Sequence, residues 1–202
     1  VFRDVQRASS LPWHKDYTRP KLLKFFLTDR DSNAAAYYDW GSELETEWKE
    51  NYKLWMTFIN EYKNRGGRVT AGADSGYMYN LYGFGYVQEL ELLREAGFHP
   101  MEVIRAATLH AAEAIGMEDQ IGSVETGKLA DLIIMDQNPL KNLKYLYATG
   151  DIKLENNEVI RVGGVSKTIK DGIIFDARKL LDDVKKIVDE EKRNTPGWEK
   201  LL

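Results

Sequence analysis

The chain has 202 residues, enough for one large domain, and its 43% hydrophobic and 30% charged residues are typical of soluble globular proteins. Its net charge of -4 comes from 28 basic and 32 acidic residues that are well mixed, so no basic stripe indicates nucleic-acid binding. Cysteine is absent, which excludes disulfides, thiolate nucleophiles and Cys-ligated zinc.

No apolar run approaches the roughly 18 residues that a membrane span requires. The start, Val1–Asp4, lacks the basic region and apolar core of a signal peptide. We therefore expect no membrane association and a cytoplasmic location. Because the first residue is valine, we expect the chain to begin inside a longer reading frame or after processing.

The first 41 residues are rich in aromatic side chains and show no regular period, so we expect a loop that covers a larger body. The clearest helix follows at 43–65, where Ser42 and Glu45 form a capping box and Gly66-Gly67 supplies the stop. Its large apolar residues recur at spacings of three and four, which predicts one core-facing stripe: Leu44, Trp48, Tyr52, Trp55, Ile59 and Tyr62.

A short buried strand is predicted at about 68–74, directly after the glycine stop, and it ends at Asp74. A helix, a glycine loop and a short strand in succession are typical of a β/α barrel or a doubly wound sheet. Catalytic groups of such barrels lie at the carboxyl ends of the strands, so Asp74 is the best candidate for a catalytic residue. The alternative is a turn residue, because Asp-Ser-Gly favours turns by itself.

The loop after Asp74 is aromatic and glycine-bearing. Tyr77, Tyr79 and Tyr82 are candidates for contacting a substrate at the barrel mouth, and packing against another part of the barrel is the equal alternative. Helices are predicted at about 86–96 and, from the favourable first-turn residue Pro100, to about Ile115.

The character of the chain changes near Gly122. Short strands are predicted at 132–135 and 159–162, and Asp171-Gly172 separates two further runs as a hairpin turn. Residues 177–193 form an amphipathic helix. The expected organisation is therefore barrel elements at 1–120, a β-sandwich segment at 121–176, and a C-terminal helix and tail at 177–202.

A family resemblance rests on the motifs between about 66 and 140. The sequence resembles the C-terminal part of the amidohydrolase superfamily, near its imidazolonepropionase-like and Xaa-Pro dipeptidase-like members. The residues that carry it are Gly72-Ala73-Asp74-Ser75-Gly76, Glu89–Phe98, Arg105-Ala106-Ala107-Thr108, Ala111–Gly116, the specific segment Gly127-Lys128-Leu129-Ala130-Asp131-Leu132, and Asn138-Pro139-Leu140.

This resemblance implies an α/β fold, namely the C-terminal part of a TIM-like (β/α)8 metallo-hydrolase barrel with a small β-sandwich segment. It implies a metal-dependent hydrolase of C–N bonds (amide, peptide or cyclic amide) that uses a divalent metal, zinc by expectation. It places Asp74 at the eighth-strand aspartate, which touches the metal and takes a proton from the metal-bound water.

Apart from Asp74, the chain has no residue that matches a metal ligand of the family. His14, His99 and His110 do not form the His-x-His pair, and we expect them to be capping or packing residues, with His14 the one remote candidate. A hydrolytic metal needs about three protein ligands. We therefore expect an incomplete C-terminal fragment that is inactive alone and acts on a small amide or dipeptide-like substrate when complete.

The alternative is a non-catalytic fragment or subunit. It would associate through its open barrel edge, either with itself or with a complementary N-terminal chain, because an open parallel edge offers unpaired backbone groups.

Overall fold

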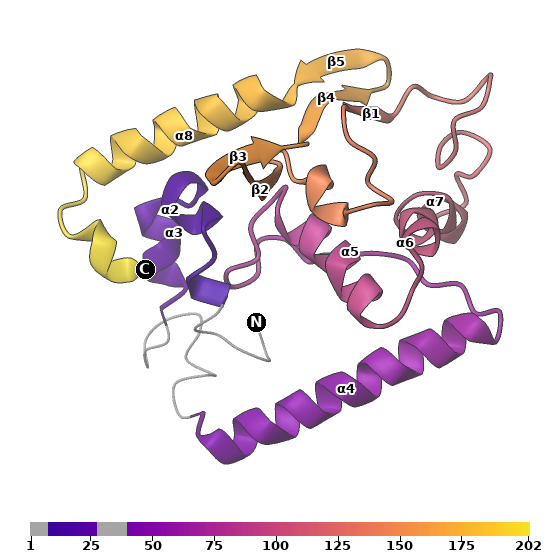
Figure 1. The fold of residues 1–202 in the computed structure, drawn as a ribbon, viewed down its shortest axis with the longest axis horizontal. Coiled ribbons are helices and arrows are strands. Elements are labelled where there is room, and N and C mark those ends of the chain that lie inside the picture. Colours follow the sequence, from indigo (N-terminus) through magenta and orange to yellow (C-terminus); the bar gives the residue numbers. More distant parts are fainter. Residues whose placement is uncertain (1–7, 28–39) are drawn as a thin grey trace. The chain divides into compact units, whose positions relative to one another are not determined.

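The computed structural model of the chain describes residues 8–27 and 40–202 (Figure 1). Contacts divide the chain into two compact units. Unit 1 contains the chain up to Trp55 together with Asp74–Tyr82 and Leu181–Leu202, and unit 2 contains Met56–Ala73 and Gly83–Leu180.

The described residues of unit 1 include two short helices, α2 (Trp13–Tyr17) and α3 (Pro20–Phe25), where a loop was predicted. The prediction of an irregular segment is wrong for these residues, because helices of one or two turns leave no measurable period in a sequence. Pro20 starts α3 in the position where proline fits a helix. The predicted loop residues 28–39, Tyr37 and Tyr38 among them, lie outside the described residues.

The C-terminal helix α8 (Ala177–Arg193) has the predicted bounds. Its unit 1 part is joined to α2 and α3 by two ion pairs, Lys185 with Asp16 at 3.2 Å and Glu191 with Arg19. The chain then closes with the 3-10 helix η3 (Trp198–Leu201), on whose Trp198 ring Lys192 lies at 4.4 Å. These contacts hold α2, α3 and α8 together as one body.

Helix α4 (Ser42–Asn64) ends as predicted. Gly66 has a φ of 86°, and the Gly67 N–H donates to the Tyr62 carbonyl at 2.9 Å. The predicted core stripe is wrong in part, because none of the helix residues is buried and Trp55 is 68% exposed. Of the predicted stripe, Ile59 packs against the core of unit 2.

Residues 68–74 do not form the predicted strand. A strand requires a ladder of backbone bonds to a neighbouring strand, and among the described residues this segment belongs to neither sheet, although the Ala71 N–H donates to the Ala106 carbonyl at 3.3 Å. Val69 and Ala71 nevertheless pack against the core of unit 2, so the segment is apolar and half-buried as its sequence indicates.

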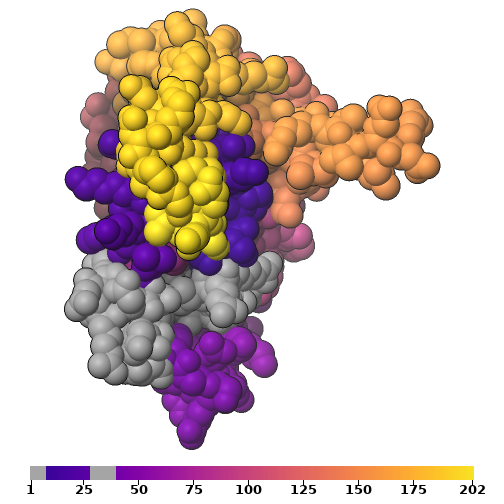
Figure 2. All heavy atoms as spheres, turned by 90° about the vertical axis from the view of Figure 1, so that its left-hand side faces the viewer, coloured from indigo at the N-terminus to yellow at the C-terminus, as the bar shows by residue number. Residues whose placement is uncertain are grey.

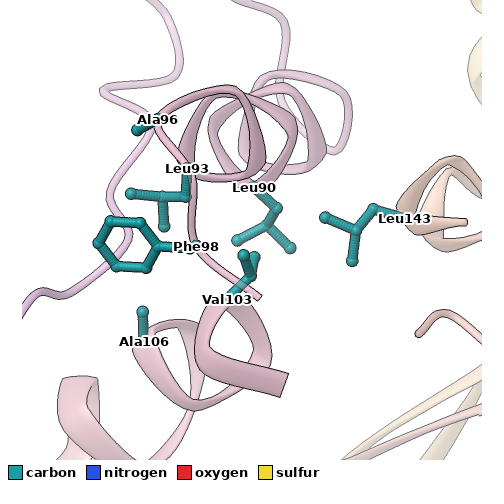
Figure 3. Close-up of a cluster of buried hydrophobic side chains, with 7 residues drawn as sticks. All are labelled: Leu90, Leu93, Ala96, Phe98, Val103, Ala106 and Leu143. Atoms are coloured by element: carbon teal, nitrogen blue, oxygen red, sulfur yellow. The ribbon is translucent and has the colours of Figure 1, made fainter. Parts of the chain in front are cut away.

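The core of unit 2 lies between helices α5 (Gly85–Glu95) and α6 (Pro100–Ala107) and the 3-10 helix η2 (Leu143–Leu146) (Figure 3). The helix predicted from Pro100 to Ile115 is broken at Thr108 into α6 and α7 (Leu109–Ala114), because the Thr108 hydroxyl donates to the Ile104 carbonyl and its ψ is -86°. The buried members of the core are Leu90, Leu93, Ala96, Phe98, Val103, Ala106 and Leu143.

The C-terminal half of unit 2 contains two small antiparallel sheets. One has the order β1-β4-β5, from β1 (Leu132–Met135), β4 (Val165–Lys170) and β5 (Ile173–Asp176), with the predicted Asp-Gly turn between the last two. The other is a hairpin of β2 (Asp151–Glu155) and β3 (Glu158–Val162). The strand β2 was missed by the sequence analysis, and the sandwich arrangement remains a prediction.

Candidate active-site loop

Asp74, the predicted catalytic residue, is exposed and starts a compact loop in unit 1. Its φ of 47° is left-handed, a conformation that aspartate tolerates better than most residues. Its carbonyl accepts from the Tyr77 N–H at 3.2 Å, and the Gly76 N–H donates to the Asn80 carbonyl at 2.8 Å. The backbone therefore closes on itself and fixes the direction in which the Asp74 side chain leaves the chain.

Gly76 cannot be replaced without strain in this loop. Its φ is 105°, and a Cβ atom at this position would lie 2.9 Å from the Tyr82 hydroxyl. The glycine thus lets the Tyr82 side chain fold back over the loop that begins at Asp74. The sequence signal for this arrangement was the Asp-Ser-Gly turn pattern itself.

The three tyrosines that were predicted to contact a substrate have different surroundings. Tyr79 is 4% exposed, and its ring packs against Phe26 at 5.3 Å and edge-on against His14 at 5.7 Å. Burial raises the pKa of the Tyr79 hydroxyl. Tyr79 is therefore the anchor of the loop, whereas Tyr77 and Tyr82 are exposed and Tyr82 reaches 73%.

The His14 side chain packs against the ring of Tyr79. Its side chain is fully buried, its Nδ1 lies 2.9 Å from the Thr18 hydroxyl, and its Nε2 has no hydrogen-bond partner among the described residues. Burial lowers the pKa of His14 to about 4, against a smaller opposite effect of the Ala8 carbonyl. No sequence pattern announces the contact between His14 and Tyr79, because it joins segments distant in the chain.

The other two histidines have structural roles, as predicted. His99 precedes α6, and its backbone N–H donates to Glu102 Oε2 at 2.7 Å. The same carboxylate accepts from Lys63 Nζ at 2.8 Å, which holds the pKa of Glu102 below its usual range. His110 Nδ1 lies 3.3 Å from the Val69 carbonyl. His99 thus takes part in the start of α6 through its backbone, and the His110 side chain contacts the apolar segment at Val69.

The metal expectation can be tested against these side chains. Within residues 8–27 and 40–202, no group of three or more histidine, aspartate or glutamate side chains is placed to hold a metal ion. Asp131 accepts from the Asp171 N–H at 2.7 Å and from Lys170, so it caps the β4–β5 turn. Asp74 offers a single carboxylate, and the described residues therefore do not fit a metal centre.

A surface hollow of about 260 Å³ lies in unit 2 and contains none of the predicted site residues. Three of its polar side chains are bonded within the protein: Glu91 accepts from the Tyr147 hydroxyl at 2.7 Å, and Asn142 Nδ2 donates to Asp151 at 2.7 Å. Arg94 likewise donates to the Phe98 carbonyl. The hollow lies beside η2, and nothing places it near Asp74 or its loop.

No helix in the described part of the chain combines the length and the apolar content that crossing a bilayer needs. Residues 55–174, which include Asp74 and the tyrosine loop, match the model of the amidohydrolase family.

Curated relatives match over part of their length. The imidazolonepropionase of Shouchella clausii (strain KSM-K16) is 32% identical over 101 residues, which are 50% of this chain and 21% of the relative. The 5'-deoxyadenosine deaminase of Methanobrevibacter smithii is 35% identical over 97 residues, 46% of this chain and 21% of the relative. The chain thus spans about a fifth of the length of these relatives.

A solved structure shares the fold. A putative prolidase from Bifidobacterium longum is similar with a TM-score of 0.51 and 24% identity, over 81% of this chain and 37% of the prolidase. Together with the family match, this likeness indicates a fold of the barrel type, to which the described residues contribute α-helices and two small sheets.

Proposed function

The chain belongs to the amidohydrolase family, and from this premise we propose that it serves in a hydrolase of C–N bonds. The observation that carries the proposal is that the family match spans residues 55–174 and so includes Asp74 and its loop. The substrate class we propose is a small amide, cyclic amide or dipeptide.

Asp74 is the proposed catalytic residue. An exposed carboxylate on a fixed loop can accept a proton from an attacking water and return it to the leaving nitrogen. Tyr77 and Tyr82 expose aromatic rings on the same loop and would contact the substrate, while Tyr79 holds the loop in place.

The divalent metal of the family is not supported by the side chains described above. We therefore propose that metal binding, with zinc as the expected ion, requires ligands beyond residues 8–27 and 40–202. In the same way, 68–74 would become the eighth strand of a barrel only beside neighbouring strands that the described residues do not supply.

The alternative function is a non-catalytic subunit that associates through its open surfaces. The absence of strand pairing at 68–74 among the described residues and the exposure of Trp55 on α4 favour a covering partner. This alternative and the hydrolase differ in whether Asp74 matters for turnover.

The test is a pair of matched substitutions in the polypeptide as its host produces it, after measurement of its intact mass and zinc content. Asp74→Asn should lower kcat by about 100-fold or more, the usual contribution of a positioned acid–base group. Asp171→Asn is the control, because Asp171 is also exposed and has a nearly equal φ of 49°.

Asn accepts the left-handed conformation at both positions, so both variants should retain the circular dichroism of the parent. A near-normal rate in the Asp74→Asn variant would refute the catalytic role. A species of ~23 kDa without zinc and without turnover would favour the non-catalytic subunit.

A further inference from the structure

The Tyr82 side chain rests on the backbone of the loop that begins at Asp74. A Cβ atom at Gly76 would lie 2.9 Å from the Tyr82 hydroxyl oxygen and 3.4 Å from Cζ of the Tyr82 ring. The polar end of the ring therefore lies over the bare Cα of Gly76, in space that any other residue would fill. Most of the ring faces solvent, since Tyr82 is 73% exposed.

This contact places the Tyr82 hydroxyl at the Asp74 end of the loop. Gly76 follows Asp74 by two residues, so their Cα atoms lie at most about 7 Å apart. The turn between them is fixed by two backbone hydrogen bonds, from the Tyr77 N–H to the Asp74 carbonyl at 3.2 Å and from the Gly76 N–H to the Asn80 carbonyl at 2.8 Å. An exposed carboxylate and an exposed hydroxyl thus lie at the same end of a compact loop.

The loop is anchored between these two groups. Tyr79 is buried against His14, which lies in α2, and against Phe26, which follows α3 directly. Figure 2 shows the indigo helices α2 and α3 beside the yellow end of α8, to which they are joined by ion pairs. The anchor therefore belongs to the packed body of unit 1. Groups held in place before a substrate arrives are those that stabilise a transition state most.

The Tyr82 hydroxyl retains its capacity to donate a hydrogen bond. Within residues 8–27 and 40–202 it makes no hydrogen bond to another protein group. Two other tyrosines have already used theirs, since the Tyr86 hydroxyl donates to the Ala107 carbonyl at 3.1 Å and the Tyr147 hydroxyl donates to Glu91 at 2.7 Å. A phenolic hydroxyl that is exposed and held against the backbone is available to a ligand.

Hydrolysis of a C–N bond needs two kinds of group at the amide. Water adds to the carbonyl carbon, the C–N bond breaks, and a proton passes from the water to the leaving nitrogen, which is the transfer proposed for Asp74. Negative charge develops meanwhile on the carbonyl oxygen, where a hydrogen-bond donor stabilises the transition state. An ionised carboxylate only accepts hydrogen bonds, so Asp74 cannot fill this second role.

We propose that Tyr82 is a second catalytic residue of the Asp74 site, whose hydroxyl donates a hydrogen bond to the carbonyl oxygen of the amide that is cleaved. The proposal rests on the proposed function and adds to it the substrate atom that Tyr82 recognises. Tyr82 keeps its proton throughout the reaction. Gly76 is the positioning residue, because the space above its Cα holds the hydroxyl in place.

The first measurement tests the position of the hydroxyl and needs no substrate. The polypeptide is isotope-labelled at tyrosine Cζ, and its NMR signal from Tyr82 is assigned by its loss in Tyr82→Phe. Gly76→Ala should shift this signal, because the new Cβ displaces the end of a flexible side chain. Gly66→Ala is the matched control, with a φ of 86° and open space around the new Cβ, and it should leave the signal unchanged. An unshifted Tyr82 signal in Gly76→Ala would overturn the proposal.

The second measurement is steady-state turnover of a dipeptide and a cyclic amide, glycyl-L-proline and hydantoin. Tyr82→Phe removes the hydroxyl alone and should lower kcat about tenfold or more at a nearly unchanged KM, because the hydrogen bond strengthens as charge develops on the oxygen. Tyr62→Phe, at an exposed tyrosine of α4, is the control and should retain the wild-type rate. Gly76→Ala should also lower kcat, and the double variant Gly76→Ala/Tyr82→Phe should lose no more than Tyr82→Phe, since both changes remove one contact.

The outcomes separate this proposal from the proposed function. A loss of turnover in Asp74→Asn together with a normal kcat in Tyr82→Phe would overturn the role of Tyr82 alone. A raised KM at unchanged kcat would do the same, because Tyr82 would then bind the substrate without acting on the transition state. So would a larger loss of kcat in Tyr77→Phe, which would assign the donor to Tyr77. Normal turnover by Asp74→Asn, or none of either probe by the wild-type protein, would overturn both proposals.

Discussion

The buried histidine beneath the candidate loop makes a testable link between pH and the stability of unit 1. His14 is fully buried and packs against Tyr79, the residue that anchors the loop of Asp74. Burial lowers its pKa from 6.5 in the unfolded chain to about 4. The perturbation we choose is His14→Gln, which removes the titrating group and keeps a polar side chain near Thr18.

The sign follows from proton binding. Between pH 6.5 and 4 the unfolded chain binds a proton at His14 that the folded chain excludes, so the free energy of unfolding falls as the pH falls. The contribution is fully present above pH 6.5. With these two pKa values, acidification from about pH 7.5 to about pH 5 should cost about 2 kcal/mol through this one group.

The assay is urea unfolding followed by tryptophan fluorescence at the two pH values. Every tryptophan of the chain lies in the segments of unit 1, so the signal reports the unit that contains His14. Groups other than His14 titrate in both proteins and cancel in the comparison. The wild-type chain should therefore lose about 2 kcal/mol more than the His14→Gln variant over this range.

The reasoning would be refuted by equal losses in the two proteins. Such a result would mean that His14 takes up its proton as readily in the folded chain as in the unfolded chain. A lower overall stability of the variant at neutral pH would not affect the comparison, because the readout is the change with pH.

Two further predictions concern packing in unit 2, and both are read from chemical unfolding followed by circular dichroism. Val103→Ala should lower the free energy of unfolding by about 2–3 kcal/mol, because Val103 is fully buried and the change removes two methyl groups from the core. Met101→Ala is the control on the same helix, and it should change the free energy of unfolding by less than about 0.5 kcal/mol because Met101 is exposed. Gly127→Ala should lower the free energy of unfolding by ~1 kcal/mol, because alanine is strained at a positive φ. Gly150→Ala should lower it by at least twice as much, because at Gly150 the added Cβ would also collide with the Val162 carbonyl oxygen, whereas at Gly127 it would meet open space. Equal costs within either pair would contradict the packing described here.

The predictions that the structure confirms depend on short stretches of sequence. The Gly66-Gly67 stop, the Asp171-Gly172 turn and the bounds of α8 each depend on a few neighbouring residues, and the structure confirms them. The family resemblance at 66–140 is confirmed by the match at 55–174, because family motifs are also local strings.

Two of the failures concern features that depend on distant parts of the chain. The segment 68–74 has the composition of a strand, but pairing needs a neighbour that the segment cannot specify. The burial of Tyr79 depends on His14 and Phe26, which no spacing rule connects to it. The strand β2 could have been found, because Asp151–Glu155 alternates apolar and charged residues up to an Asn-Asn turn.

The catalytic role of Asp74 and the substrate contacts of Tyr77 and Tyr82 remain predictions. The structure supplies their surroundings, a closed backbone loop and two exposed rings, and these could not be read from the residue types. Tyrosine in a loop serves equally as an anchor or as a contact surface, and only three-dimensional burial separates Tyr79 from its two neighbours.

The pairing of α2 and α3 with α8 has a consequence for synthesis on the ribosome. Arg19 and Glu191, which join these helices, are separated by 172 residues. At a synthesis rate of about 5–20 residues per second, about 10–30 s pass between the synthesis of α2 and α3 and the synthesis of the part of α8 that binds them. Unit 2 ends at Leu180 and is translated in full before the last segment of unit 1. Within these 202 residues, α2 and α3 are therefore made before unit 2 and completed as part of a folded unit after it.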